Sequence, residues 1–388
     1  MRTSDFKTKT KNVPMTFPAP KRFWPIGLDM GYSGVKGISP NKAFCFPAYA
    51  RQLPERVTIM KEASPDDIRY RDKENGEWAV GSLAYDEVNA NDVIDSESEL
   101  YGRHRFYSPM FLVQARTGIA MGLLENETGM HVNDRKIVIQ TGLPPKFEKQ
   151  DTPDLKAVLS GHHSFDIKIG RKPWRHIEYT LDENDIYVMP QPMGSLVSAS
   201  INKEGRPVPD SVKFFNSNLI IFDPGFGTVD TYTVVKGVVT GSETLLNLGM
   251  KEVFARTCRD IYDNYKTEIL VPELQNMLDE GKVYVMDKRA MKRNRYDFSE
   301  MLAKNCKDVC AETIERMKSI HNYFTNCDYI IATGGTYEAW QEDFDTVFKD
   351  MEGLAIVPGN INDPNLSNVF SNVRGYYFYI ANKLRNIA

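Results

Sequence analysis

The chain has 388 residues, of which 41% are hydrophobic and 26% charged, and its formal net charge is -4. Because single hydrophobic cores stop growing at about 250–300 residues, this length favours two domains, with room for a cleft between them. The small negative charge excludes a global attraction to nucleic acid or to an anionic membrane. No run of about 18 apolar residues occurs, so we expect no transmembrane helix.

The five cysteines form an odd set without a Cys-x-x-Cys pair. This usage disfavours a disulfide scaffold and a zinc ribbon, and it fits a reducing cytoplasm. Cys306 and Cys310 are four residues apart within a stretch of helical periodicity. We therefore expect them to be small core residues on a buried helix face, and not metal or redox ligands.

The first 22 residues are basic and rich in proline. They lack the apolar core of a signal peptide, and their prolines oppose a helix. We expect residues 1–22 to form a flexible basic extension, which could mediate a contact. Ordered structure is predicted to begin with a buried strand at residues 23–28, followed by the glycine-containing turn "DMGYSGVKGI" at residues 29–38.

The middle of the chain alternates between predicted helices and strands. Its acidic residues 86–99 suggest a loop or a solvated helix, and residues 109–124 have helical periodicity. The remaining predictions are a buried strand within 135–145, alternating strands within 165–189 and a Gly- and Pro-rich linker at 202–211.

A second strand and turn, "FDPGFGTVDTY" at residues 222–232, repeats the features of the first. Asp, Gly, an aromatic residue and Val occur at the same offsets from Asp29 and from Asp223. The repeat predicts two related halves, each opening with a strand, a tight turn and a second strand. After it we expect helices at 250–265 and 298–324, a basic solvated face or partner site at 282–295, a strand entering a third glycine turn within 327–340, and a closing helix at 372–384.

Either turn alone could be an ordinary hairpin, because Asp, Pro and Gly are common turn residues. As a pair from two domains, the turns could clamp one polyphosphate, since glycine lets backbone N–H groups converge on an anion. Lys36 would supply a positive charge, and Asp29 and Asp223 would hold a hydrated magnesium ion. The P-loop and Rossmann patterns are absent, and the period of two after Gly227 indicates a strand, not a helix.

These segments together resemble the superfamily shared by actin, the large heat-shock chaperones and the sugar kinases. "IGLDMGYSGVKG" and "IIFDPGFGTVDTY" resemble its two phosphate motifs, "IIATGGTYEAW" its adenosine motif, and "VMPQPMGSLVSA" its connecting helix. Within the superfamily, the length, "TGLPP" and "NVRGYYFYIAN" are most similar to the ParM and StbA group of plasmid-segregation actins.

The resemblance implies an α/β, actin-like two-domain fold, each domain being a ribonuclease H-like mixed sheet with flanking helices. The nucleotide would occupy the cleft between the domains. Domain I would comprise residues 23–201 plus 369–388, and domain II residues 202–368.

The resemblance also implies roles for individual residues. Asp29 and Asp223 would organise Mg²⁺ through water and, with Gln191, form the catalytic set. Gln191 stands where actins carry glutamine and many bacterial relatives glutamate; an amide is no strong base but can orient water. The implied nucleotide-binding residues are Gly31, Tyr32, Ser33, Gly34, Lys36, Gly225, Phe226, Gly227, Thr228, Lys251, Gly334, Gly335, Thr336 and Tyr337.

The function implied by the resemblance is a cytoplasmic ATPase, possibly a GTPase, that polymerises into dynamic filaments and drives plasmid DNA segregation. Its partners would be further copies of itself and a DNA-bound adaptor of the ParR type, without direct nucleic-acid or membrane binding. A small-molecule kinase of the same superfamily is the main alternative, and a non-polymerising nucleotide switch is a third.

Overall fold

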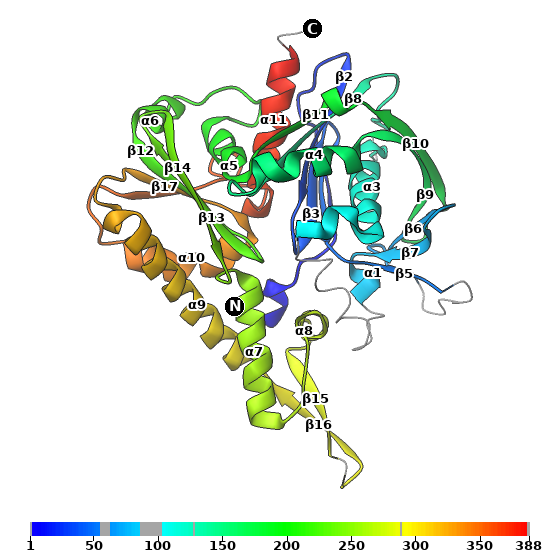
Figure 1. Ribbon diagram of the computed structural model, residues 1–388, viewed down its shortest axis with the longest axis vertical. Helices are drawn as coiled ribbons and strands as arrows, with labels where there is room; N and C mark the ends of the chain where they lie inside the picture. Colours follow the sequence, from blue (N-terminus) through cyan, green and yellow to red (C-terminus); the bar gives the residue numbers. More distant parts are fainter. Residues whose placement is uncertain (1, 55–62, 86–102, 127–128, 288, 386–388) are drawn as a thin grey trace.

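The computed structural model describes residues 2–54, 63–85, 103–126, 129–287 and 289–385. The acidic stretch at 86–99, expected as a loop or solvated helix, lies outside these residues. Within them, no helix combines the length and apolar character that crossing a membrane requires. The chain forms two α/β halves that lie next to each other (Figure 1).

A six-stranded mixed sheet forms the centre of the first half. The first four strands in the chain pair with one another in antiparallel fashion, and the last two continue the sheet with parallel pairing. The spatial order is β1 (Lys11–Pro14), β4 (Lys42–Pro47), β3 (Gly34–Ser39), β2 (Phe23–Met30), β8 (Lys136–Leu143) and β11 (Ile186–Pro190).

A five-stranded sheet in the second half repeats this pattern. Its order is β14 (Val238–Leu246), β13 (Thr228–Val235), β12 (Asn218–Pro224), β17 (Tyr329–Ala332) and β18 (Ala355–Pro358), with antiparallel pairs first and parallel pairs last. Asp29 pairs with Lys36 across β2 and β3, and Asp223 pairs with Asp230 across β12 and β13. The predicted relation between the two hairpins is therefore confirmed by topology and by register.

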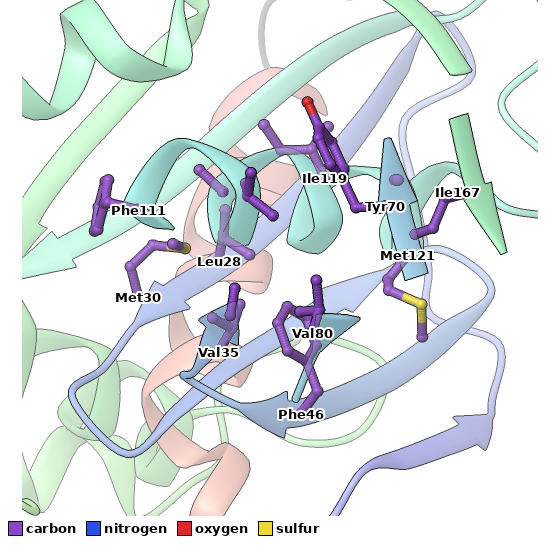
Figure 2. Packing of buried hydrophobic residues seen from close by; sticks show 14 of the residues in the cluster. Leu28, Met30, Val35, Phe46, Tyr70, Val80, Phe111, Ile119, Met121 and Ile167 are labelled. Atoms are coloured by element: carbon purple, nitrogen blue, oxygen red, sulfur yellow. The ribbon is translucent and has the colours of Figure 1, made fainter. Parts of the chain in front are cut away.

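Alternating residues of β2 face two different layers of helices. Ile26 and Leu28 face α3 (Pro109–Leu123), where Gly118 and Gly122 leave room for their side chains. Figure 2 shows this core, to which Leu28 and Val35 of the first hairpin and Phe111 and Ile119 of α3 all belong. Gly27, between them, faces α11 (Ser371–Arg385), whose backbone approaches too closely for a Cβ atom. A period of two thus buries both faces of the strand.

The other helices cover the two sheets or join them. The predicted helices at 109–124, 250–265, 298–324 and 372–384 are confirmed, and Cys306 and Cys310 are buried on the third of these. The remaining bounds are α1 (Ser82–Tyr85), α4 (Glu148–Leu159), α5 (Gln191–Ser200), α6 (Ser211–Asn216), α7 (Met250–Tyr265), α8 (Val271–Met277), α9 (Ser299–Ile320) and α10 (Gly334–Phe348), with 3₁₀ turns η1 (Thr3–Phe6), η2 (Arg103–Tyr107), η3 (Glu183–Asp185), η4 (Asn322–Phe324) and η5 (Asn368–Phe370).

Two further sheets extend the halves. An antiparallel sheet in the first half has the order β10 (Arg175–Leu181), β9 (Gly161–Ile169), β6 (Ile68–Asp72), β7 (Gly76–Val80) and β5 (Ala50–Gln52), of which the sequence predicted strands only within 165–189. The basic stretch at 282–295 lies in a hairpin of β15 (Lys282–Asp287) and β16 (Lys292–Asp297), which projects from the second half in Figure 1.

The N-terminal residues differ from the flexible extension that was expected. β1 adds to the edge of the first sheet by antiparallel pairing with β4. Phe17 is 3% exposed, and its ring centroid lies 5.4 Å from that of Tyr377. Two stabilising effects order this segment. Its backbone pairs with an open sheet edge, and the apolar side chains of Val13, Met15 and Phe17 are packed against a helix. Together they outweigh the tendency toward disorder that the prolines and the charge confer.

Helices α5 and α11 cross at a contact between two glycines. A Cβ atom at Gly375 would lie 1.7 Å from the Gly194 carbonyl oxygen, and one at Gly194 would lie 2.6 Å from the Asn372 carbonyl oxygen. Arg374, fully buried beside this contact, donates from Nη1 to the Ser198 carbonyl at 2.7 Å. At the crossing the backbone of each helix contacts the backbone of the other. Backbone atoms cannot move aside as a flexible side chain could, so an added side chain would not be accommodated.

We therefore expect Gly375→Ala to lower the free energy of unfolding by about 1–3 kcal/mol, the usual cost of overpacking a rigid core. Urea denaturation would measure the loss. Gly241→Ala on β14 is the matched control, because its Cβ would approach nothing nearer than 3.9 Å. Equal stability of the two variants would contradict the close crossing.

Candidate functional site

A cavity of about 450 Å³ lies between the two halves of the chain. The turns after β2 and β12 form two of its walls, and the first residues of α5 and α10 border it. The N-terminal segment contributes a further wall. Segments far apart in the sequence thus surround one space, as the paired hairpins predicted.

Asp29, at the end of β2, is buried and bonded to two side chains. Lys36 Nζ lies 3.3 Å from Asp29 Oδ2, and Gln191 Nε2 donates to Asp29 Oδ1 at 3.1 Å. Burial lowers the pKa of Lys36, but the negative charges of Asp29 and Asp223 outweigh it, so the net pKa is raised. Lys36 is therefore held as a cation in the cavity wall.

Asp223 occupies the corresponding place at the end of β12. Its Oδ2 accepts a hydrogen bond of 2.5 Å from Asn372 Nδ2, so the two halves meet at this carboxylate. Burial raises the pKa of Asp223 to about 6, although the hydrogen bond from Asn372 and the charge of Lys36 lower it, and the nearby Asp29 raises it further. Desolvation and a like charge make this carboxylate a good ligand for an added cation.

Asp230 is a second buried carboxylate on the same hairpin. Thr244 Oγ1 donates to its Oδ1 at 2.7 Å, and Thr228 Oγ1 donates to its Oδ2 at 3.2 Å. Burial raises the pKa of Asp230 to about 7, the charge of Asp223 adds to this effect, and the two threonines oppose it. Asp230 thus stands where Lys36 stands in the first hairpin, with the opposite charge.

The two hairpin turns touch each other at the cavity. A Cβ atom at Gly227 would lie 3.1 Å from the Tyr32 ring. Within each turn the first glycine is close to its own hairpin: Gly31 faces the Gly34 carbonyl, and the Gly225 amide donates to the Thr228 carbonyl at 2.7 Å. The glycines thus allow tight turns that bring backbone toward the cavity.

The third glycine segment is a helix N-terminus and not the turn that was predicted. Gly334 has φ of 88° and begins α10, where a Cβ atom would lie 2.9 Å from Asp223 Oδ1. Thr336 Oγ1 donates to the Gly225 carbonyl at 2.9 Å, which ties this helix to the second hairpin. The start of a helix offers free N–H groups and positive dipole potential, both of which favour an anion.

Most of the predicted site residues line the cavity. Those that do are Asp29, Gly31, Tyr32, Ser33, Lys36, Gln191, Asp223, Gly225, Phe226, Thr228, Gly334, Gly335 and Thr336, whereas Gly34, Gly227, Lys251 and Tyr337 are not part of the lining. Tyr337 is 1% exposed and packs its ring on Phe344, with centroids 5.6 Å apart. Its helical position turns the side chain into the core, and the place of Tyr337 near a base stays a prediction.

Sequence reasoning missed several lining residues. Arg105 in η2 lies with its guanidinium carbon 4.5 Å from the centre of the Tyr32 ring, and burial lowers its pKa. Asn372 and Asp230 also line the cavity, as do residues of the N-terminal segment. Arg105 belongs to no motif, and Asn372 opens the closing-helix motif without any signal of its contact with Asp223, because only tertiary packing brings these residues to the hairpins. Asp230 lies within the second hairpin motif, at the position that Lys36 occupies in the first, so the repeat alone assigns it no role.

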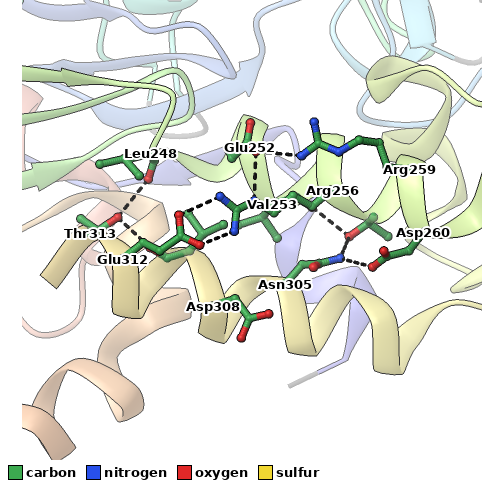
Figure 3. Close-up of polar contacts among 12 residues, drawn as sticks. Leu248, Glu252, Val253, Arg256, Arg259, Asp260, Asn305, Asp308, Glu312 and Thr313 are labelled. Carbon is green, nitrogen blue, oxygen red and sulfur yellow. Dashed lines mark hydrogen bonds and ion pairs between the residues drawn. The ribbon is translucent and has the colours of Figure 1, made fainter. Parts of the chain in front are cut away.

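Helix α7 begins directly beside the second hairpin and is braced by α9. The amides of Met250 and Lys251 donate to the carbonyls of Gly225 and Phe226, at 3.3 and 2.8 Å. Figure 3 shows the brace, in which Arg256 donates two parallel hydrogen bonds to Glu312, at 2.5 and 2.8 Å. This bidentate pair joins α7 to α9. Because α7 is hydrogen-bonded to the turn, the pair also links the turn to α9.

Comparisons with known proteins give the same fold as the structure. Residues 27–194 match the family model described as the N-terminal domain of actin-like proteins. A solved structure of a non-polymerisable quadruple mutant of pCBH ParM superposes with a TM-score of 0.70 at 21% identity, covering 92% of this chain and 99% of that one. The chain has an actin-like fold.

Other actin-like structures agree with this assignment. A 15-stranded ParM filament from Clostridium botulinum superposes with a TM-score of 0.68 at 20% identity, covering 93% of this chain and 99% of that one. An archaeal actin homologue in complex with ADP gives a TM-score of 0.60 at 15% identity, over 93% of this chain and 100% of that one. No curated protein sequence matches the chain.

The cavity of this actin-like chain has the donors that Mg²⁺ prefers. Magnesium is usually held by one or two carboxylates while it keeps waters and binds substrate phosphates. Asp29 and Asp223 meet that requirement as oxygen donors from the two halves. In the part of the chain that the structure describes, no cluster of three or more His, Cys, Asp or Glu side chains suits a more fully protein-ligated metal.

The raised pKa of Asp230 predicts a pH dependence of stability. An acid with a folded pKa above its unfolded value stabilises the fold below the unfolded pKa and loses that contribution as pH rises through the folded value, here about 7. Without nucleotide or Mg²⁺, the parent protein should therefore lose stability relative to Asp230→Asn as pH rises, by up to about 1.4 kcal/mol per pH unit between about pH 4 and 7.

Urea denaturation of both proteins over that range would measure the difference. Asp308→Asn on α9 is the control, because its side chain is 50% exposed. Parallel pH profiles of the parent and Asp230→Asn would show that Asp230 titrates normally in the folded protein.

Proposed function

We propose that this chain is a nucleotide-dependent filament protein that binds ATP or GTP with Mg²⁺ in the cavity and hydrolyses it. The observation that carries the proposal is the pair of equivalent hairpins, which bring Asp29 and Asp223 to one cavity from two sheets. Such a pair encloses a polyphosphate from two sides. The ADP bound to the similar archaeal actin homologue supports a nucleotide as the ligand.

The phosphates would lie between the hairpin turns and the start of α10. Backbone amides near Gly31 and Gly225 would donate to phosphate oxygens, and Lys36 would balance part of their charge. Asp29 and Asp223 would hold Mg²⁺ through water; when bound, the ion neutralises charge that develops on the phosphates. The other end of the nucleotide would lie along α10, near Gly335 and Thr336.

In this proposal, Gln191 positions the attacking water. Its Nε2 donates to Asp29, which fixes the amide at the cavity wall, and Oε1 would accept a hydrogen bond from the water. An amide in this role orients water without removing its proton as a strong base would. The first turn of α5 holds Gln191, and the glycine crossing with α11 holds α5.

Similarity to filament structures supports the proposal that hydrolysis serves to regulate filament assembly. Besides the Clostridium botulinum ParM filament, an Alp12 filament superposes with a TM-score of 0.56 at 15% identity. We infer a role in plasmid DNA segregation with a DNA-bound adaptor of the ParR type, as in the ParM group that the motifs resemble. Nucleotide binding between two halves gives such a protein a direct way to alter its assembly surfaces.

Sedimentation and light scattering of the purified protein with Mg-ATP, with Mg-GTP and without nucleotide test this proposal. We expect pelleting and increased scattering only with a nucleoside triphosphate and Mg²⁺. A protein that stays monomeric throughout but phosphorylates a sugar or an acid would be a kinase of the same fold.

Two substitutions separate hydrolysis from assembly. Asp223→Ala should abolish Mg²⁺-dependent phosphate release, because it removes one of the two carboxylates facing the ion. Gln191→Ala should slow release by about 10²-fold, the lower end for loss of a group acting in proton transfer or water positioning, while assembly persists. Phosphate release and pelleting measured on the same samples would check both. Equal loss of both in Gln191→Ala would show a structural role instead.

A further inference from the structure

The N-terminal segment bridges the two halves of the chain. On the first half, β1 pairs with β4, with Lys11 opposite Cys45 and Val13 opposite Ala43. The thiol of Cys45 adds a hydrogen bond to the Lys9 carbonyl at 3.3 Å. This end of the segment is therefore part of the first sheet.

The other end of the segment is attached to the second half. Thr3 Oγ1 donates to the Leu278 carbonyl at 2.6 Å, and Lys7 Nζ lies 2.5 Å from Asp279 Oδ2. Phe6 packs against the hydrophobic core of that half. These contacts are few and separate from the sheet, in contrast to the continuous backbone pairing of β1.

The residues between the two attachments run along the cavity. Ser4 to Lys9 and Lys11 are all lining residues, on the same space as Asp29 and Asp223. Thr8 lies against the first hairpin, where its Cγ2 would be 3.0 Å from a Cβ atom at Gly34. A ligand held by both hairpins would therefore have this segment as a neighbour.

We propose that residues 3–14 form a strap that closes the cavity over a bound nucleotide and controls its exchange. This inference rests on the proposed nucleotide site. The strap is hinged on the first half by β1 and latched to the second half by Thr3 and Lys7. Separation of the halves must break the latch or strip β1 from the sheet, and the latch is the weaker attachment.

The latch is suited to repeated opening. The Lys7 side chain is 17% exposed and that of Asp279 is 53% exposed, so solvent screens the ion pair and limits its strength. Lys7, Lys9 and Lys11 also bring positive charge to the cavity wall, which favours the closed strap when phosphates are present. Closure over a ligand by a segment joining two bodies is a common way to retain it.

A reversible cross-link tests the strap directly. Thr3 Oγ1 would lie 2.9 Å from a Cβ atom at Gly281, so Thr3→Cys with Gly281→Cys places two thiols within bonding reach. Release of a fluorescent ATP analogue, chased with unlabelled ATP, is measured in oxidised and reduced samples. We expect oxidation to slow release at least about tenfold and reduction to restore it, because a covalent latch cannot open. The two single variants control for thiol chemistry and for the φ of 64° at Gly281.

Weakening the latch gives the opposite change without a cross-link. Lys7→Gln and Asp279→Asn should each speed release about two- to fivefold, as expected for a partly exposed ion pair, and the exchanged pair Lys7→Asp with Asp279→Lys should restore it. Arg2→Gln is the matched control, since Arg2 precedes the strap and its ion pair is with Asp5 of the strap, not with the second half.

Unchanged release rates in both the cross-linked and the weakened proteins would overturn the strap. If the parent protein itself fails to bind the analogue, the proposed nucleotide site is wrong, and the strap proposal is overturned with it.

Discussion

Three carboxylates buried in the cavity wall determine how the rest of the site must be built. Asp29, Asp223 and Asp230 are each less than 10% exposed, and burying like charges together is unfavourable unless each finds hydrogen-bond donors or a cation. Gln191 and Asn372 supply donors from α5 and α11, and threonines supply them to Asp230. The crossing of α5 and α11 therefore has an electrostatic effect as well as a packing one, because it holds both donors next to the carboxylates. A bound Mg²⁺ would balance the charge that remains.

The repeated sheet explains why the carboxylates converge. In each half, a strand ends with an aspartate and turns into an antiparallel partner, while parallel strands follow on its other side. Two copies that face one cavity bring the strand ends together from opposite sides. The copies differ at one paired position, where the first hairpin has Lys36 and the second has Asp230. The cavity thus has unlike walls, which is suited to a ligand with a polyphosphate chain and a metal ion.

Local patterns predicted the parts of this site that depend on short stretches of chain. The hairpins, the helices and the burial of Cys306 and Cys310 follow from periodicity and turn chemistry, whereas the actin-like fold was implied by the resemblance of the motifs to a known superfamily. Arg105, Asn372 and β1 could not be predicted, because they depend on packing between distant segments. At Gly334 the glycines suggested a turn, whereas helix formation after Thr333 buries Tyr337 and Trp340 in the core. At the N-terminus, the charge and the prolines favoured a flexible segment, so neither the edge strand β1 nor the burial of Phe17 was predicted.

Contacts across the cavity connect the ligand site to the helices of both halves. Asn372 joins α11 to Asp223, Thr336 joins α10 to the second hairpin, and α5 packs against both main sheets. A ligand that draws the hairpins together must move these helices with them, since closely packed helices shift as units and do not deform continuously. The same helices and sheets carry the outer surface of each half. In the proposed function, occupancy of the cavity would thereby be coupled to the relative position of the two outer surfaces, which is the mechanical requirement for a filament whose stability depends on its nucleotide.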